Sequence, residues 1–188
     1  MNINKKNKGL TFLETIASVA IILIVSSFLF CKIIDYNEKK DLQISRHLIQ
    51  NIFMKYTNKS FYQKIRYLLE IDLKNKILII KNQNNEVIEE INLPLKLKYE
   101  IPYENVRNPY FKVETTKTGN LSKAFTFYIF GYKEQVENRI AFYTFQKEKI
   151  LKLNVYLNQN VKNIYYKNII EYHYSQNGQN RIGWVEEE

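Results

Sequence analysis

The sequence predicts an α+β fold, in which a long N-terminal helix, half transmembrane and half amphipathic, packs on an antiparallel β-sheet domain. First, residues 10–34 contain only two charges, Glu14 and Lys32, and about 20 apolar residues suffice for a membrane helix. Second, apolar residues in 35–60 recur at three- and four-residue steps, which is typical of one face of an amphipathic helix. Third, beyond residue 76 the period changes to two, with frequent β-branched and aromatic residues.

Composition limits the chain to one modest core besides the apolar segment. Of its 188 residues, 45% are hydrophobic and 14% aromatic, so we expect one extramembrane domain, residues 61–188. The net charge of +9 is compatible with anionic lipid or nucleic acid and does not choose between them. Cys31 is the only cysteine. We therefore expect no intrachain disulfide, and we expect Cys31 to be a small buried apolar residue.

Motifs for catalysis and for cofactor binding are missing from the sequence. Its five glycines form no phosphate-binding loop, nucleophile elbow or dinucleotide fingerprint. The two histidines, His47 and His173, have no cysteine or carboxylate at metal-ligand spacing. We expect each to be a surface or packing residue, with His47 in the region of the packing face of the predicted helix and His173 in a strand. The sequence predicts a protein that is not an enzyme and that has no metal and no cofactor.

A short basic leader, residues 1–9, precedes the apolar segment. It carries three lysines and no acidic residue, which predicts a cytoplasmic N-terminus and a C-terminal domain outside. A cleaved secretory signal peptide is the main alternative. Against it, Glu14 interrupts the apolar run, and residues 28–30 are bulky where a signal peptidase needs small side chains.

Residues 8–14 (KGLTFLE) resemble the class III leader of type IV pilins and type II secretion pseudopilins. The resemblance implies cleavage between Gly9 and Leu10 by a prepilin peptidase, N-methylation of Leu10, and Glu14 as the fifth mature residue. The family usually has Phe or Met at the first mature position, where this chain has Leu10.

Glu14 is the most informative residue of this motif. A lone carboxylate in a membrane helix costs on the order of 3 kcal/mol, so it usually has a partner. The ammonium created at Leu10 of one chain could be neutralised by Glu14 of a neighbour and so set the axial register. In a plain signal anchor, Glu14 would be incidental.

The resemblance implies a type IV pilin-like fold and a structural role. The implied function is that of a minor pilin or pseudopilin subunit, near the tip of a type II secretion pseudopilus or of a type IV or competence pilus. The implied location is the bacterial inner membrane, crossed once, and then the filament. The implied partners are the prepilin peptidase, other pilin or pseudopilin subunits, the inner-membrane assembly platform and the membrane.

The helix is expected to continue beyond the apolar segment, because Gly9 and Pro94 enclose a stretch without Gly or Pro. We expect it to stop at residues 58–60 and to be followed by a short helix or turn over 61–70. One face of 35–60 should pack on a sheet. That face consists of Leu42, Ser45, Ile49, Ile52, Phe53 and Tyr56.

Alternating segments beyond residue 76 predict strands. Residues 77–81 and 87–93 flank an NQNN turn and predict a hairpin. Residues 95–101 alternate between apolar and charged, whereas 123–132 are apolar on both faces and predict a central strand. The other expected strands are 110–114, 139–146 and 150–157, of which the last two form a hairpin around 147–149.

The last third of the chain carries a second resemblance, to the closing segment of J-type minor pseudopilins and their competence-system counterparts. It rests on a loose apolar spacing that ends in a tryptophan. The segments concerned are 139–143, 150–152, 161–164, 170–174 and Trp184.

A basic aromatic strip for single-stranded nucleic acid is an alternative for this region, since stacking contributes about 1–3 kcal/mol per base. We favour half-buried cross-strand tyrosine pairs for these residues. We also expect residues 186–188 to form a solvated tail. Two alternative functions remain open, namely a DNA-contacting competence pilus subunit and a membrane-anchored β domain of unknown role. The strip would comprise Tyr165, Tyr166, Tyr172, Tyr174, Lys162, Lys167 and Arg181.

Overall fold

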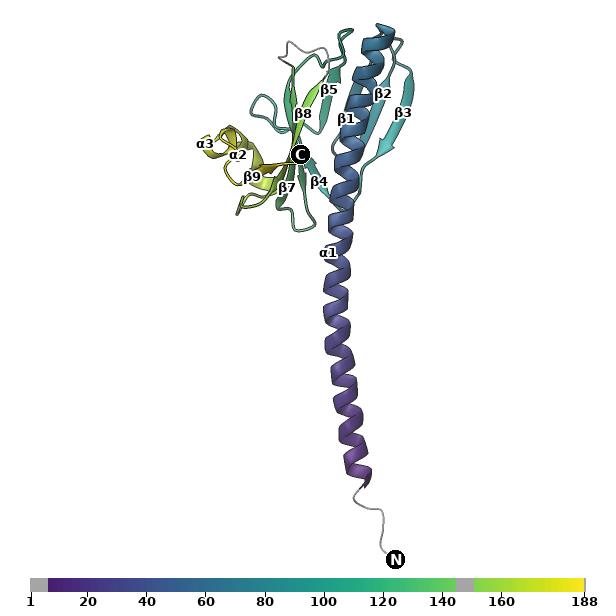
Figure 1. Cartoon of the computed structure of the whole chain (residues 1–188), viewed down its shortest axis with the longest axis vertical. Coiled ribbons are helices and arrows are strands. Elements are labelled where there is room, and N and C mark those ends of the chain that lie inside the picture. The colour runs from purple at the N-terminus through teal and green to yellow at the C-terminus, as the bar shows by residue number, and fades with distance from the viewer. Residues whose placement is uncertain (1–6, 145–150, 188) are drawn as a thin grey trace, which may run out of the picture. The chain divides into compact units, whose positions relative to one another are not determined.

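The structure is a computed structural model that describes residues 7–144 and 151–187 (Figure 1). The predicted α+β fold is confirmed, because one long helix, α1 (Asn7–Gln63), is followed by antiparallel sheets. The chain divides into two compact units, Met1–Lys40 and Asp41–Glu188. The boundary between the units therefore falls within α1.

The first sheet has four antiparallel strands in the order β3-β2-β1-β5. The predicted hairpin of 77–81 and 87–93 is confirmed, since β2 pairs with β3. The predicted strand over 110–114 is confirmed as β5, in which Phe111 and Val113 are buried and the three residues on the other face are exposed. The strands are β1 (Leu68–Asp72), β2 (Ile77–Lys81), β3 (Val87–Asn92) and β5 (Tyr110–Glu114).

The second sheet has five strands in the order β4-β6-β7-β8-β9, and all its neighbours are antiparallel. The predicted central strand within 123–132 is confirmed as β6, an interior strand whose six residues are all buried. The strands are β4 (Lys98–Glu100), β6 (Phe125–Phe130), β7 (Val136–Tyr143), β8 (Lys152–Asn158) and β9 (Trp184–Glu186).

Both faces of the second sheet are covered, which explains why β6 is apolar throughout. Phe127 and Ile129 belong to one core, whereas Tyr128 and Phe130 belong to the other. Successive side chains of a strand point to opposite faces. Successive residues of β6 therefore belong alternately to the two cores, so the second sheet lies between two layers.

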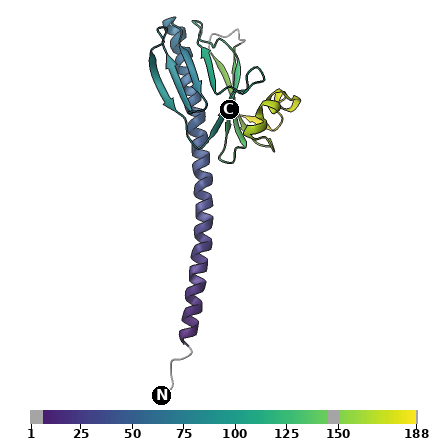
Figure 2. The same cartoon turned by 180° about the vertical axis from the view of Figure 1, so that it is seen from behind.

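The first core joins the C-terminal part of α1 to both sheets. The predicted packing face of the helix is confirmed, since Ile49, Ile52, Phe53 and Tyr56 are all buried. The Phe53 ring lies 4.5 Å from the Phe142 ring, measured between centroids. Figures 1 and 2 show β1 and β2 beside this part of the helix from both sides.

The second core lies under three short helices, which are η1 (Tyr166–Asn168), α2 (Ile169–Tyr174) and α3 (Gln176–Gln179). Figure 2 shows α2 and α3 on the side of the second sheet that faces away from residues 41–63 of α1. Within this core the Trp184 indole N–H donates to the Tyr172 hydroxyl at 2.8 Å. The terminal strand and the short helices are thereby fastened together.

The expectation of a short helix or turn over 61–70 is wrong. Helix α1 runs on to Gln63, and strand β1 begins at Leu68. Lys64 adopts a φ of 58°, the left-handed conformation that commonly ends a helix. Leu69 and Ile71 are then buried on one face of the new strand, so period-two burial starts earlier than predicted.

Two further expectations near the second sheet are corrected. Residues 170–174 form helix α2 rather than a strand, because Ile169 and Tyr172, one helical step apart, are both buried against the sheet. The strand predicted over 95–101 is shortened to β4, which begins at Lys98, after residues 95–97 have formed a turn.

The expected solvated tail is also partly wrong. Glu186 ends strand β9, and Glu187 forms an ion pair with Arg46 at 2.5 Å. Residue 188 lies outside the described residues. Of the hairpin expected from 139–146 and 150–157, strands β7 and β8 do pair. The turn expected at 147–149 lies outside the described residues.

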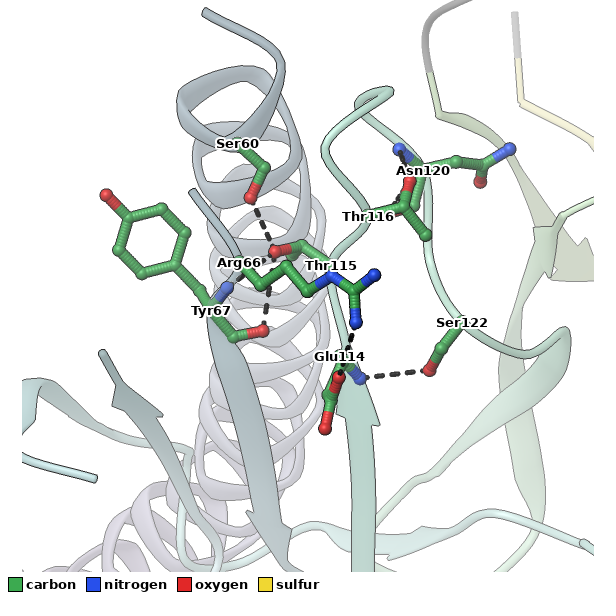
Figure 3. Close-up of polar contacts among 8 residues, drawn as sticks. All are labelled: Ser60, Arg66, Tyr67, Glu114, Thr115, Thr116, Asn120 and Ser122. Carbon is green, nitrogen blue, oxygen red and sulfur yellow. Dashed lines mark hydrogen bonds and ion pairs between the residues drawn. The ribbon is translucent and has the colours of Figure 1, made fainter. Parts of the chain in front are cut away.

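A polar cluster fastens the end of α1 to the first sheet, and Thr115 is its centre (Figure 3). The Thr115 and Ser60 hydroxyl oxygens lie 2.5 Å apart, and the Tyr67 amide N–H donates to Thr115 Oγ1 at 2.8 Å. The Thr115 amide N–H in turn donates to the Tyr67 carbonyl at 2.9 Å. Because Ser60 and Thr115 are fully buried, water cannot replace these bonds.

We expect Thr115→Val to lower the free energy of unfolding by about 1–3 kcal/mol, since the same shape without the hydroxyl leaves the Ser60 hydroxyl and the Tyr67 amide unsatisfied. Urea unfolding of the full chain in detergent micelles measures the effect. Thr118→Val, on the exposed turn of the same loop, is the control and should change stability by less than about 0.5 kcal/mol. Equal losses in both variants would contradict this role of Thr115.

Candidate functional site

The N-terminal apolar segment presents its side chains outward along its whole length. Every residue from 11 to 34 is exposed, including large apolar residues such as Phe12 and Phe28 at 67% and 69%. Among the described residues, one helix is long and apolar enough to cross a membrane, with a mean hydropathy of 2.4 over 18 residues. A surface of this composition needs lipid or protein partners to cover it.

Hydroxyl groups in this segment are satisfied by the helix itself. The Thr15 hydroxyl donates to the Thr11 carbonyl at 2.7 Å, and the Ser18 hydroxyl donates to the Glu14 carbonyl at 2.8 Å. Ser26 and Ser27 bond in the same way to carbonyls four residues earlier. These bonds reduce the cost of placing hydroxyl groups in an apolar medium.

Glu14 differs from these hydroxyl residues. Its side chain is exposed, and within residues 7–144 and 151–187 the structure records no hydrogen bond or ion pair for its carboxylate. Gly9 and Leu10 lie in the first turn of α1, and Glu14 follows Leu10 by one turn. The carboxylate is therefore open to a group supplied from outside the chain.

The expectation that Cys31 is buried is wrong for the chain by itself. Its thiol is free, and the residue is exposed, like its neighbours along the apolar segment. The sequence suggested burial because cysteine is usually an interior residue. Here the apolar surroundings of Cys31 would have to come from outside the chain.

The proposed strip of tyrosines and basic residues is not assembled as one surface. Tyr172 is buried in the second core, and none of the four tyrosines lies on a strand, so the cross-strand pairs that we favoured are also absent from the described residues. Tyr166 is stacked by Arg107, whose guanidinium lies 4.2 Å from the ring centroid. Arg181 instead contacts Tyr143 and Tyr156, two tyrosines outside the expected set.

Arg107 has a structural role that the sequence analysis did not predict. Its Nε lies 2.7 Å from the Glu100 carboxylate, which is only 1% exposed. Burial raises the pKa of Glu100, although the nearby Arg107 charge opposes this effect. Arg107 also donates to the Tyr166 carbonyl at 2.6 Å. The pair therefore connects β4 to the short helices rather than presenting charge to a ligand.

A pocket of about 490 Å³ opens beside β7, α2 and α3. It brings Tyr174 and Arg181, two members of the expected strip, together with residues that sequence reasoning missed. Chief among these is Arg139, a buried arginine on the interior strand β7. The available signal was an arginine between Asn138 and the apolar residues 140–143 of the same strand. The side chains that matter below are Arg139, Tyr143, His173, Tyr174, Gln179 and Arg181.

The two histidines occupy different surroundings. His47 is exposed on α1, whereas His173 lines the pocket on α2 rather than on the expected strand. The Tyr128 hydroxyl lies 3.0 Å from His173 Nδ1. Burial, assisted by the charge of Arg139, lowers the pKa of His173 from 6.5 to about 4. Both residues are thus surface or packing residues, and no group of three or more potential metal ligands occurs among the described residues.

We expect acid to destabilise the fold through His173. Between pH 6.5 and about 4 the unfolded chain binds a proton that native His173 does not, so this stability is present above pH 6.5 and is lost as the pH falls toward 4. His173→Gln should flatten that part of the curve of unfolding free energy against pH, measured by urea unfolding. His47→Gln is the matched control, and an equal flattening by it would contradict the assignment.

Comparisons with known proteins add the following. No protein-family model matches the chain, and no curated protein sequence matches it. Similar solved structures include two of the minor pseudopilin EpsH from the type 2 secretion system of Vibrio cholerae. One is 13% identical, covers 59% of this chain and 94% of that chain, and has a TM-score of 0.44. The other is 15% identical, covers 64% and 94%, and has a TM-score of 0.39.

These comparisons do not test the J-type resemblance of the last third of the chain, which stays a prediction.

Proposed function

We propose that this chain is a minor pilin or pseudopilin subunit, held in the inner membrane until a pilus machine adds it to a filament. The observation that carries the proposal is the KGLTFLE motif at the start of an exposed apolar helix. Generic anchors need the helix but not the motif. The same helix continues into a packed β domain, which supports a subunit that is fixed in a membrane and functional outside it.

Processing is the first step of the proposed function. A prepilin peptidase cuts between Gly9 and Leu10, and the new amine at Leu10 is methylated. Removal of the lysine-rich leader leaves a mature chain whose first four side chains, before Glu14, are uncharged. The mature N-terminus can then leave the cytoplasmic boundary and enter an apolar bundle.

Assembly uses the outward side chains of residues 11–34 as the contact surface. Glu14 neutralises the ammonium at Leu10 of a neighbouring subunit, in surroundings where an isolated charge would be costly. This pairing fixes how far one helix slides along the next. The partners are other pilin or pseudopilin subunits and the inner-membrane assembly platform, with the N-terminus in the cytoplasm and the β domain outside.

A nucleic-acid role receives no support from the geometry. Aromatic side chains of the last third contact arginines in separate places, since Tyr166 contacts Arg107 and Tyr156 contacts Arg181. Nonspecific binding of single strands needs a continuous basic groove with stacked aromatic rings. The structural role is therefore the function that we propose, and the tip position, the competence pathway and the J-type assignment remain predictions.

Mass spectrometry of the protein extracted from membranes of cells that express the whole machine tests this function. We expect a mature N-terminus at Leu10 that carries one methyl group. Gly9→Val is the matched control and should leave the leader attached, because the peptidase reads the glycine at the cut. A start at Met1 in the wild-type chain, or a start beyond Cys31, would overturn the proposal and leave a membrane-anchored β domain.

A further inference from the structure

Arg139 is a buried charge for which the described residues provide no counter-ion. The residue is 7% exposed, and its Nη1 donates to the Gly178 carbonyl at 2.9 Å. Its Nε is buried without a hydrogen-bond partner, and no carboxylate of the described residues forms an ion pair with it. Buried charges in proteins are normally paired. The tyrosine rings near the guanidinium, at 5.7 and 5.8 Å, compensate it only in part.

The same arginine lines the 490 Å³ pocket, and a second arginine lies in the wall with it. Arg181 donates to the Tyr156 hydroxyl at 2.5 Å and to the Tyr143 hydroxyl at 2.9 Å. It too has no carboxylate partner within the described part of the chain. Its φ of 56° is unusual for a long side chain, and the two tyrosine hydroxyls hold its guanidinium in place. The pocket thus contains two positioned guanidinium groups.

The charged side chains that line the pocket have a net positive charge. Arg139 and Arg181 are opposed by one acidic residue, Glu104, and His173 is neutral at pH 7. One negative charge would therefore balance the pocket. Arginine is well suited to carboxylate oxygens, since its planar fork can donate two parallel hydrogen bonds.

We propose that this pocket binds a single carboxylate group, presented by an acidic side chain or a chain end of another polypeptide. Tyr143, Tyr174 and Gln179 supply further polar groups at the wall. A polyanion fits less well, because the described residues that line the pocket include two cationic side chains, Arg139 and Arg181, whereas Lys162 and Lys167 of the expected strip do not line it. The inference is independent of the proposed filament role, since it rests on the pocket and not on the leader.

The test uses the full chain in detergent micelles at pH 7, with blocked glutamate (N-acetyl-glutamate N-methylamide) as the probe. The ring signals of the two histidines are followed by NMR and assigned with His47→Gln. We expect a saturable shift of the His173 signals, because His173 lines the pocket, and none of the His47 signals. Blocked glutamine, which has the same shape without the charge, should produce no saturable shift.

Two variants connect the binding to the arginines. Arg139→Gln and Arg181→Gln should each weaken binding of blocked glutamate roughly tenfold or more, the expected loss of a charge-assisted hydrogen bond. Lys162→Gln, on the same domain outside the pocket, should leave it unchanged. Arg139→Gln should also keep or raise the thermal unfolding midpoint without the probe, because it removes an uncompensated buried charge. Arg181 is exposed, so its variant stays informative if Arg139→Gln fails to fold.

Three outcomes would overturn the proposal. The first is the absence of a saturable shift at His173. The second is equal binding of blocked glutamine, which would show that the charge is not recognised. The third is tighter binding of a thymidine dinucleotide than of blocked glutamate, which would assign the pocket to nucleic acid.

Discussion

Replacing Glu14 by alanine should abolish assembly with fellow subunits while leaving leader cleavage and membrane insertion intact. Cleavage should survive because the peptidase reads the leader and Gly9, and insertion should survive because the helix becomes more apolar. Assembly should fail because the ammonium at Leu10 of the neighbour loses its counter-ion in a low-dielectric bundle. Breaking such a buried pair costs about 3–5 kcal/mol, which corresponds to a loss of association of roughly 100-fold or more.

Co-purification of the variant with its fellow subunits, from cells that express the whole machine, measures this loss. Glu14→Asp keeps the charge but shortens the reach, so it should assemble less well than the wild type and better than Glu14→Ala. Asp35→Ala is the matched control, because Asp35 is the first acidic residue after the apolar segment and is exposed. Association of Glu14→Ala at the wild-type level would show that the carboxylate is incidental.

Replacing Phe53 by alanine should produce the largest loss of stability in the β domain. Phe53 is fully buried, and its ring lies 4.5 Å from the Phe142 ring and 5.7 Å from the Phe125 ring. The ring thus joins α1 to strands β6 and β7. Removing a buried phenylalanine side chain typically lowers the free energy of unfolding by about 3–5 kcal/mol, through lost burial and the cavity that remains.

Met54→Ala is the control for this change, because Met54 is the next residue on the same helix and is 43% exposed. It should lower the free energy of unfolding by less than about 1 kcal/mol. Urea unfolding of both full-length variants in micelles, followed by circular dichroism, gives the comparison. Similar losses for Phe53→Ala and Met54→Ala would contradict the placement of the helix on the sheets.

The helix and most strands were predictable because their burial has a regular period along the chain. Ile49, Ile52, Phe53 and Tyr56 repeat at helical steps, and all four are buried. Strand β5 follows the alternation of its sequence. The division into two sheets was not predictable, since strand partners far apart in sequence are chosen by the packing of whole layers.

The sequence pattern of residues 169–174 led to a wrong prediction of secondary structure. Tyr172 and Tyr174 alternate as in a strand, yet Ile169 and Tyr172 lie on one helical face and cover the second sheet. A short apolar run permits either structure, and tertiary contacts decide between them. β1 was missed for a related reason, because its alternation begins immediately after a helix that could have continued.

The candidate site was predictable to a different degree in each part. Gly9, Leu10 and Glu14 were predicted from a local motif, and the partners proposed for them, a peptidase and a neighbouring subunit, lie outside this chain. Arg139 was missed, because its strand was interpreted by its apolar neighbours. The pocket that surrounds Arg139 forms from segments up to 79 residues apart, the separation of Pro102 and Arg181. A local sequence pattern does not predict contacts between segments so far apart.

Photo-crosslinking from the apolar segment tests the central claim, that this helix is an assembly surface, most directly. A photoreactive residue is placed at Val19, which is 51% exposed and lies near Glu14 along α1, in cells that express the whole machine. The predicted result is a crosslink to a second pilin-like subunit that disappears in the Glu14→Ala background. A chain that forms no protein adduct, or whose adducts are unchanged by Glu14→Ala, would contradict the claim.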